Sequence, residues 1–542
     1  MPLTGDSETT AAEASPETRA KAWLARRPQC LRYLIFTLCA ALYLLPFMRV
    51  LIQAMGGDEG SLVYGAVRIV HGQVFARDFF EAMGPGTFYW LAAFFKLFGV
   101  TFLASRICLF VSSLGTALSV YFLSRRVCTR YQLLPCLILA GTYFPVLWPG
   151  ISHHVDSNFF ALLSVACVVL WHGRPRNSLL IAAGALAGVT AFTLQQKGVL
   201  LFCAILVWLW LQRRRVTAPL FSIGMVTAGF LGVVGSVLLY FWTQGALGSL
   251  IYVNVVWPFR RYEGINNVPY ALGIVSWYWD SYISMKSAFS WPFDLAAYAV
   301  AAILIAPFLF VAALPALMPL SALWAILPSR NIWRTVTPEI VLYGLCGSAM
   351  WFSEIHRKDI THLVFGSPLL IVLCIYFLDL NRSRFSGYAL QLLAITAAWL
   401  ATFNLIGVLA AHSVTTRVGS VAVFKDDPVL AFMNTRVAAG QEVFVYPYHP
   451  MYYFLSATTN PTRYSFLTYN YNIPAQFQEI VDVLERRRVR YVVWDTGLEA
   501  RNADIFPGSH PKGPSDRIIE PYLESHYRLV LDDHGVWVME RK

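Results

Sequence analysis

Long apolar runs constrain the fold of this chain more than any other feature. Runs of roughly 18 to 25 residues, the length that crosses the hydrocarbon core of a bilayer as a helix, recur from Leu31 to Ala411. Apolar residues make up 57% of the sequence and the mean hydropathy is +0.53, which argues against an ordinary soluble protein. The sequence therefore predicts a polytopic α-helical membrane protein.

About eleven spans follow from these runs. They are predicted at residues 31–55, 102–124, 132–148, 157–171, 179–194, 199–211, 218–242, 295–327, 339–352, 363–378 and 390–411. The apolar segment Thr87–Phe98 is too short to cross, so an interfacial or re-entrant helix is expected there. Residues 1–29 are polar and lack the apolar core of a signal peptide, so the first span is expected to act as the insertion signal.

Basic residues set the predicted orientation. Arg19, Lys21, Arg26, Arg27 and Arg32 precede or open the first span, which predicts a cytoplasmic N-terminus. The other loops on that face are also basic, whereas clustered acids and paired histidines fall on the opposite face. The net charge of +11 therefore indicates membrane orientation and no nucleic-acid partner. Because no retention signal ends the sequence, we expect a bacterial inner (plasma) membrane.

The composition divides the chain into three predicted regions. Residues 1–30 are a cytoplasmic tail, and residues 31–412 are a transmembrane domain whose first outer loop, 56–101, is a candidate catalytic loop. Residues 413–542 are predicted to be a small extracytoplasmic α/β domain. Its expected elements are a strand in GQEVFVYP, a helix in AQFQEIVDVLERRR, a strand in VRYVVWD and a terminal hairpin turning at residues 532–535.

The first outer loop contains the acidic residues that are the strongest candidates for a catalytic or metal-binding role. Asp58 and Glu59 follow the first span directly, and Glu81 precedes a break at Gly84-Pro85-Gly86. The intervening segment is predicted to be an amphipathic helix lying on the membrane. A carboxylate at this boundary could deprotonate a hydroxyl, or Asp58 and Glu59 could hold a divalent cation such as Mg²⁺, Mn²⁺ or Zn²⁺. A solvated loop pair is the alternative, and no cofactor is certain.

Two further clusters are predicted to lie on the same face. His153, His154 and Asp156 could assist metal or phosphate binding, or only cap and anchor the following helix. Lys197, in the predicted turn LQQKG, must face water, a phosphate or a carboxylate, or else its side chain snorkels to the interface. The nine cysteines form no CxxC or Cys/His pattern, so neither a disulfide framework nor a cysteine zinc site is expected.

The first loop resembles that of a known family. An Asp-Glu pair after the first span, an interfacial helix, a Gly/Pro break and an FxxLFG segment ending at Gly99 are similar to the membrane glycosyltransferases of the C superfamily. The most similar groups are protein O-mannosyltransferase-like proteins, aminoarabinose transferases of lipid A, and lipopolysaccharide-core galacturonosyl and mannosyl transferases. The resemblance implies a polyprenyl-phosphate sugar donor and inverting transfer, with Asp58 as general base and Glu59 beside it. Many relatives have Lys-Pro-Pro where this chain has Met83-Gly84-Pro85, so a lysine that could contact the donor phosphate is absent there.

Cations for the donor phosphate are expected in two later loops. Arg260 and Arg261 lie in WPFRRYEG, and HRKDITH resembles an Arg-x-Asp-x-x-His pattern of the superfamily. The matching positions are Arg357, Asp359 and His362, with Lys358 adjacent. Arginine and lysine could stabilise the leaving phosphate. Related proteins often have a lysine in the turn that holds Lys197, so the resemblance also favours a contact between Lys197 and the lipid phosphate. The alternative is an interfacial charge cluster that anchors the next span.

The predicted activity is transfer of a hexosyl or pentosyl group to a lipid, glycan or protein hydroxyl at the outer membrane face. Membrane lipids are the expected surroundings. A lipid or solute transporter would need ionisable residues deep within spans, whereas the polar residues here gather at one face. An inactive scaffold of the same family is the third possibility.

Overall fold

The computed structural model describes residues 16–51, 57–81, 83–143, 149–214, 218–261, 266–288, 290–292, 294–327, 336–381, 383–498 and 512–542. The chain divides into two compact units, Met1–Tyr43 and Leu44–Lys542. Helix α1 (Pro16–Leu44) accounts for the described part of the first unit. All packing described below lies within the second unit.

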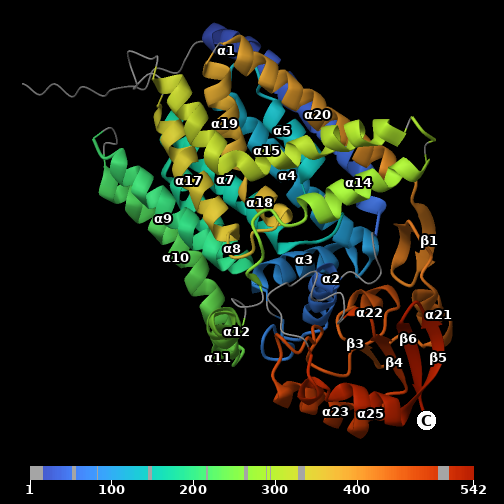
Figure 1. The fold of residues 1–542 in the computed structure, drawn as a ribbon. Coiled ribbons are helices and arrows are strands. Elements are labelled where there is room, and N and C mark those ends of the chain that lie inside the picture. Colours follow the sequence, from blue (N-terminus) through green and yellow to red (C-terminus); the bar gives the residue numbers. More distant parts are fainter. Residues whose placement is uncertain are drawn as a thin grey trace, which may run out of the picture. The chain divides into compact units, whose positions relative to one another are not determined.

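Helices dominate the second unit up to residue 409 (Figure 1). The longer ones are α2 (Gly57–Val70), α3 (Pro85–Phe98), α4 (Phe102–Val127), α5 (Leu134–Thr142), α7 (His153–Gly173), α8 (Asn177–Thr193), α9 (Gln195–Leu211), α10 (Pro219–Thr243), α15 (Asp294–Ile326), α17 (Pro338–Glu354), α18 (Ile360–Gly366), α19 (Pro368–Leu380) and α20 (Arg384–Leu409). Short helices connect α10 to α15, namely α11 (Leu247–Ile251), α12 (Trp257–Arg261) and α14 (Asp280–Ser284), with single 3₁₀ or π turns between them.

Among the described residues, six helices are long and apolar enough to cross a membrane, or seven if the bent pair α18 and α19 counts as one span. Helices α8 and α9 are apolar but shorter. The predicted runs at 102–124, 179–194, 218–242, 295–327 and 339–352 coincide with α4, α8, α10, α15 and α17 to within a few residues. The number of spans stays a prediction, and part of the run predicted at 132–148 lies outside the described residues.

The run predicted as one span at 363–378 is broken. Helices α18 and α19 meet at an angle of 71°. Pro368 opens α19, and proline at this position has no N–H with which to continue the hydrogen bonding of α18. The break leaves α18 as a separate short helix that begins at the residues of the HRKDITH loop.

Helix α2 is buried on both of its faces, whereas the sequence predicted an amphipathic helix lying on the membrane. On one side α3 approaches so closely that a Cβ on Gly65 would lie 2.5 Å from the Phe88 ring. On the other side lies α22 (Met451–Leu455), where a side chain at Gly60 would collide with the Met451 backbone. The rings of Tyr64 and Tyr453 are 4.7 Å apart. The C-terminal part of the chain therefore covers the first loop.

A four-stranded sheet organises the C-terminal region. Its order is β3 (Val443–Tyr446), β4 (Tyr491–Asp495), β6 (Val536–Arg541) and β5 (Tyr527–Asp533), with β3 and β4 parallel and the other pairs antiparallel. Helices α21 (Pro428–Arg436), α23 (Pro474–Arg487) and α25 (Ile519–His526) accompany it, and β1 (His412–Thr416) and β2 (Gly419–Val423) form a separate hairpin. Three positions on one face of α23, spaced three and four apart, are buried, namely Phe477, Ile480 and Leu484.

The elements predicted in this region are confirmed: strands at 443–446 and 491–495, the helix at 474–487 and the hairpin of β5 and β6. The hairpin turns at His534 and Gly535. Their φ values of 50° and 88° lie in the left-handed region, which glycine adopts without strain. Figure 1 shows α2 and α3 in blue between helices α4, α7 and α18 and the red C-terminal elements. Backbone hydrogen bonds join the two parts, from Phe80 N to Arg463 O (2.8 Å) and from Phe102 N to Val418 O (2.9 Å).

Candidate functional site

Asp58 lies in the first turn of α2 and is exposed. Its Oδ1 accepts a hydrogen bond from the hydroxyl of Tyr448, a residue of the C-terminal region that lies 390 positions further along the chain. Gly57 makes this approach possible, because any side chain there would overlap the Tyr448 ring. Burial, followed by the nearby Asp58 carboxylate, raises the pKa of Tyr448 well above its usual value, so the tyrosine stays a hydrogen-bond donor.

Glu59, the neighbour of Asp58, has a different environment. It forms an ion pair with Arg106, whose side chain in the first turns of α4 is only 1% exposed. One of its carboxylate oxygens also accepts a hydrogen bond of 3.0 Å from the Ile151 backbone N–H, and Arg106 bonds the Val50 carbonyl. Glu59 therefore ties α2 to α4 and to the segment before α7, whereas Asp58 keeps solvent access.

Glu81 is buried near these two acids, with an exposed fraction of 1%. Burial raises its pKa to about 7, against the opposing effects of the Ser465 hydroxyl and the Arg68 guanidinium. Its Oε1 has no hydrogen-bond partner among the described residues. A carboxyl group with these properties can hold or release a proton near neutral pH.

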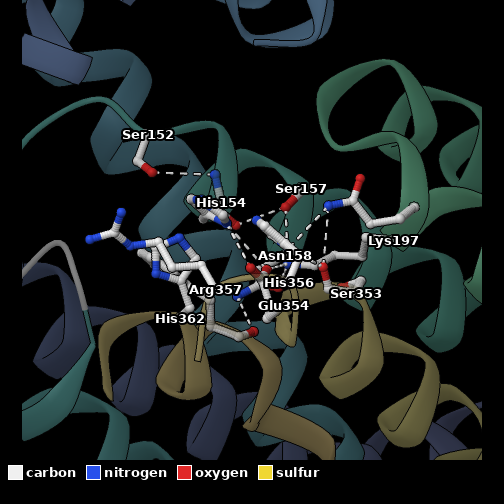
Figure 2. A network of polar contacts seen from close by, with 12 residues as sticks. Ser152, His154, Ser157, Asn158, Lys197, Ser353, Glu354, His356, Arg357 and His362 are labelled. Carbon is white, nitrogen blue, oxygen red and sulfur yellow. Dashed lines mark hydrogen bonds and ion pairs between the residues drawn. The ribbon is translucent and has the colours of Figure 1, made fainter. Parts of the chain in front are cut away.

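A second polar cluster forms where the ends of α7, α9 and α17 meet (Figure 2). The Lys197 ammonium lies 2.6 Å from Glu354 Oε1, and both side chains are completely buried. It also donates to Ser157 Oγ (3.1 Å) and Asn158 Oδ1 (2.8 Å). His154 Nδ1 lies 3.0 Å from Glu354 Oε2. Lys197 was predicted in a turn, but it lies in the first turn of α9, where its three N–H donors have three oxygen partners.

The HRKDITH loop completes this cluster at the start of α18. Asp359 is the N-cap of the helix, bonding the His362 backbone N–H, and its two oxygens bind Arg357 Nε (2.5 Å) and His362 Nδ1 (2.8 Å). Burial alone would raise the pKa of Asp359, but His362 and Arg357 hold it well below its usual range. Arg357 Nη1 also bonds Asn266 Oδ1 at 3.2 Å. Burial lowers the pKa of the neighbouring His356 to about 4.

The remaining predicted site residues lie apart from these contacts or at their edge. Asp156 bonds Thr87 Oγ1 (2.9 Å) and Ser112 Oγ (2.7 Å), so it joins α7 to α3 and α4. His153 packs its ring 4.1 Å from that of His154. Lys358 Nζ bonds Asn267 Oδ1 at 3.1 Å, and Arg260 and Arg261 are exposed at the end of α12. Within the described part of the chain, metal-ligand geometry occurs in the histidine cluster and not at Asp58 and Glu59.

A short series of contacts connects the two clusters. The Tyr448 ring packs against the Phe466 ring, with 4.2 Å between the ring centroids, and Phe466 packs against Tyr471 with 4.7 Å between theirs. The Tyr471 hydroxyl accepts a hydrogen bond of 3.1 Å from Asn266, whose Oδ1 binds Arg357. Burial raises the pKa of Tyr471 to about 12, with Arg357 lowering it and Asp58 raising it. Tyr471 therefore interacts electrostatically with both Asp58 of the first cluster and Arg357 of the second.

Sequence reasoning missed three of the contact residues. Arg106 stands near the start of a predicted span, and a buried arginine at that position needs an acid, which was the available signal. Glu354 belongs to the same SEIHRKDITH segment as the predicted cations. Tyr448 follows a predicted strand, and no pattern in the sequence relates it to Asp58.

The fold and these clusters define a polytopic α-helical membrane protein with its polar side chains collected at helix ends. Residues 82–240 match the model of the dolichyl-phosphate-mannose-protein mannosyltransferase family. This match confirms, for that segment, the similarity to C-superfamily membrane glycosyltransferases. The crystal structure of ArnT from Cupriavidus metallidurans bound to undecaprenyl phosphate aligns with 94% of this chain and 97% of that chain, at 12% identity and a TM-score of 0.41. No curated protein sequence matches the chain.

Proposed function

We propose that this protein is an inverting glycosyltransferase that moves a sugar from a polyprenyl-phosphate carrier to an acceptor hydroxyl. The observation that carries the proposal is that the exposed carboxylate of Asp58 and the guanidinium of Arg357 lie at the two ends of one series of contacts through Tyr471. The match of residues 82–240 to a family named for dolichyl-phosphate-mannose, a sugar on a polyprenyl-type phosphate, supports the donor class.

Asp58 is the proposed general base. The acceptor oxygen attacks the anomeric carbon while its proton passes to the Asp58 carboxylate. The bond between the anomeric carbon and the phosphate oxygen breaks, and its electron pair leaves with the polyprenyl phosphate. Attack from the side opposite the leaving group inverts the anomeric configuration. The Tyr448 hydroxyl orients Asp58 through its hydrogen bond, and Glu59 holds α2 in place through Arg106.

Arg357 is the proposed cation for the leaving phosphate. Its guanidinium is fixed by Asp359 and Asn266, so little side-chain freedom is lost when an anion binds. Lys197 was predicted to contact the phosphate directly, but its three donors are engaged in the structure. We assign it the role of neutralising Glu354. The exposed Arg260 and Arg261 and the half-buried Lys358 supply additional positive charge at the end of α12 and beside Arg357.

The proposed reaction takes place at the extracytoplasmic face of a bacterial inner membrane, with the N-terminus in the cytoplasm and the C-terminal region on the reaction side. This topology follows from the basic loops predicted on the cytoplasmic face. The donor sugar is a hexosyl or pentosyl group, and the acceptor is a lipid, glycan or protein hydroxyl.

The test uses the purified full-length protein reconstituted in vesicles with a panel of polyprenyl-phosphate sugars and extracted envelope lipids as acceptors. Release of free polyprenyl phosphate is the readout. Wild-type turnover that is lost in Asp58→Asn and kept in Asp426→Asn supports the proposal, because Asp426 is an exposed acid bound only to His412 among the described contacts. Full activity of Asp58→Asn contradicts the role of the base. Donor binding without transfer would instead identify a scaffold, and movement of intact donor across the vesicle membrane would identify a transporter.

A further inference from the structure

The histidine cluster contains a set of side chains arranged like the ligands of a metal ion. His154, Glu354 and His362 each offer one ligand atom, and these atoms lie within 4.8 Å of one another. They come from the start of α7, the end of α17 and the start of α18. We propose that this trio binds a divalent transition-metal ion of the zinc type, a site separate from the acids Asp58 and Glu59.

The chemistry of the three donors fits such an ion. Two imidazoles and one carboxylate are a common ligand set for Zn²⁺, and a site with three protein ligands keeps one position for water or an anionic oxygen. Hard cations such as Mg²⁺ prefer oxygen ligands and rarely take two histidines. The trio is also largely enclosed, with His154 7% exposed and Glu354 0% exposed. The coordinating atoms are therefore shielded from competing solvent.

The carboxylate has an oxygen to spare. Lys197 Nζ (2.6 Å) and His154 Nδ1 (3.2 Å) both bond Oε1 of Glu354. Oε2 is buried without a hydrogen-bond partner among the described residues and lies 3.0 Å from the same His154 Nδ1. A buried carboxylate oxygen that makes no hydrogen bond is energetically unfavourable. A metal ion between Oε2 and the two imidazoles would satisfy it.

Both histidine rings are already oriented by neighbours. His362 Nδ1 bonds the Asp359 carboxylate at 2.8 Å, which directs the Nδ1 proton to Asp359 and leaves Nε2 with a free electron pair. Ligating histidines usually have such a carboxylate behind them. The His154 ring lies 4.7 Å from the Phe365 ring at an interplanar angle of 7°, so stacking fixes its plane. These supporting contacts distinguish the trio from a chance grouping of polar side chains.

Metal binding is measured on the full-length protein in detergent, without donor or acceptor, so the result is independent of the proposed transfer reaction. After chelation and buffer exchange, Zn²⁺ or Co²⁺ is titrated and the bound metal is counted by mass spectrometry. We expect one equivalent in the wild type and its loss in His154→Gln and in His362→Gln. His153→Gln is the matched control, because it removes the adjacent imidazole and should keep the equivalent. Asp359→Asn should weaken binding by about 10-fold to 100-fold.

Two further measurements separate this site from alternatives. The Co²⁺ spectrum should lack a thiolate charge-transfer band, because none of the proposed ligands is a cysteine. Lys197→Gln should bind the metal more tightly than the wild type, since it removes a positive charge beside Glu354, and misfolding cannot produce a tighter site. The proposal is overturned if the wild type binds less than one equivalent, if binding survives in both histidine variants, or if the cobalt spectrum shows thiolate ligation.

Discussion

The two polar clusters of this protein differ in how their charges are satisfied. In the first-loop cluster, Asp58 is exposed, and among the described residues its one hydrogen-bond partner is neutral, the Tyr448 hydroxyl. In the histidine cluster, Lys197 and Glu354 are fully buried and paired with each other. An exposed carboxylate with one neutral partner can accept a proton from a substrate, whereas a buried pair must stay paired to avoid a large desolvation penalty. The comparison separates a chemical role from a supporting one.

Removal of the exposed carboxylate of Asp58 tests its proposed chemical role and should have the largest effect, a loss of transfer activity. Asp58→Asn keeps the shape of the side chain but removes its basicity, so we expect transfer to fall by about 10²-fold to 10⁴-fold. The rate of polyprenyl-phosphate release in vesicles is the measurement. Glu59→Gln is informative beside it: this variant breaks the ion pair with Arg106 and should lower thermal stability, which Asp58→Asn should leave nearly unchanged. Equal losses of stability in both variants would remove the distinction between the two acids.

Breaking the buried ion pair of Lys197 and Glu354 tests whether this pair stabilises the fold. Lys197→Met or Glu354→Gln leaves one partner without its counterpart, and we expect each to lower the free energy of unfolding by about 3–5 kcal/mol. The double variant Lys197→Met/Glu354→Met should recover most of this loss, because both charges are then gone. Denaturant unfolding followed by fluorescence in detergent is the measurement. If the single variants were as stable as the wild type, the pair would not support the fold.

Glu81 lies between these extremes, since it is buried yet belongs to the first loop. Its pKa of about 7 exceeds the ordinary value of 4.5, so the folded state holds the proton more tightly than the unfolded state. Stability should therefore fall as the pH rises from about 4.5 to about 7, by roughly 3 kcal/mol at about 1.4 kcal/mol per pKa unit. In Glu81→Gln this part of the pH dependence should vanish. Unfolding curves across this pH range would reveal it, and an unchanged slope in the variant would contradict the assignment.

The hydrogen bond from Tyr448 should have the smallest effect. Tyr448→Phe removes only a hydroxyl, so we expect a loss of about 1–3 kcal/mol in transition-state stabilisation or in stability, as for hydrogen bonds to charged groups. Activity measured alongside thermal unfolding separates the two. Tyr452→Phe is a suitable control, because it removes a hydroxyl of the neighbouring helix α22 that bonds Asp427 and not Asp58. Equal loss of activity in both variants would indicate a general effect of the C-terminal region.

Much of the helical architecture could be predicted from the sequence, because apolar runs of sufficient length have few alternatives to a membrane helix. Helices α4, α10 and α15 lie close to their predicted bounds. The bend between α18 and α19 was not predicted, although Pro368 was visible, because an apolar run was read as a continuous span. The burial of α2 was also missed, since the covering residues of α22 lie almost 400 positions away.

The sequence by itself determined the membrane class, the strands and helix of the C-terminal region, and the residue types from which a site could be built. Those features follow from hydrophobicity and local periodicity, which act over a few residues at a time. Only the tertiary structure decided that Asp58 meets Tyr448, that Glu59 meets Arg106, and that Lys197 and His154 share Glu354. The reason is physical: pairing a buried or boundary charge requires close approach of side chains, and helix packing sets that approach between residues remote in sequence.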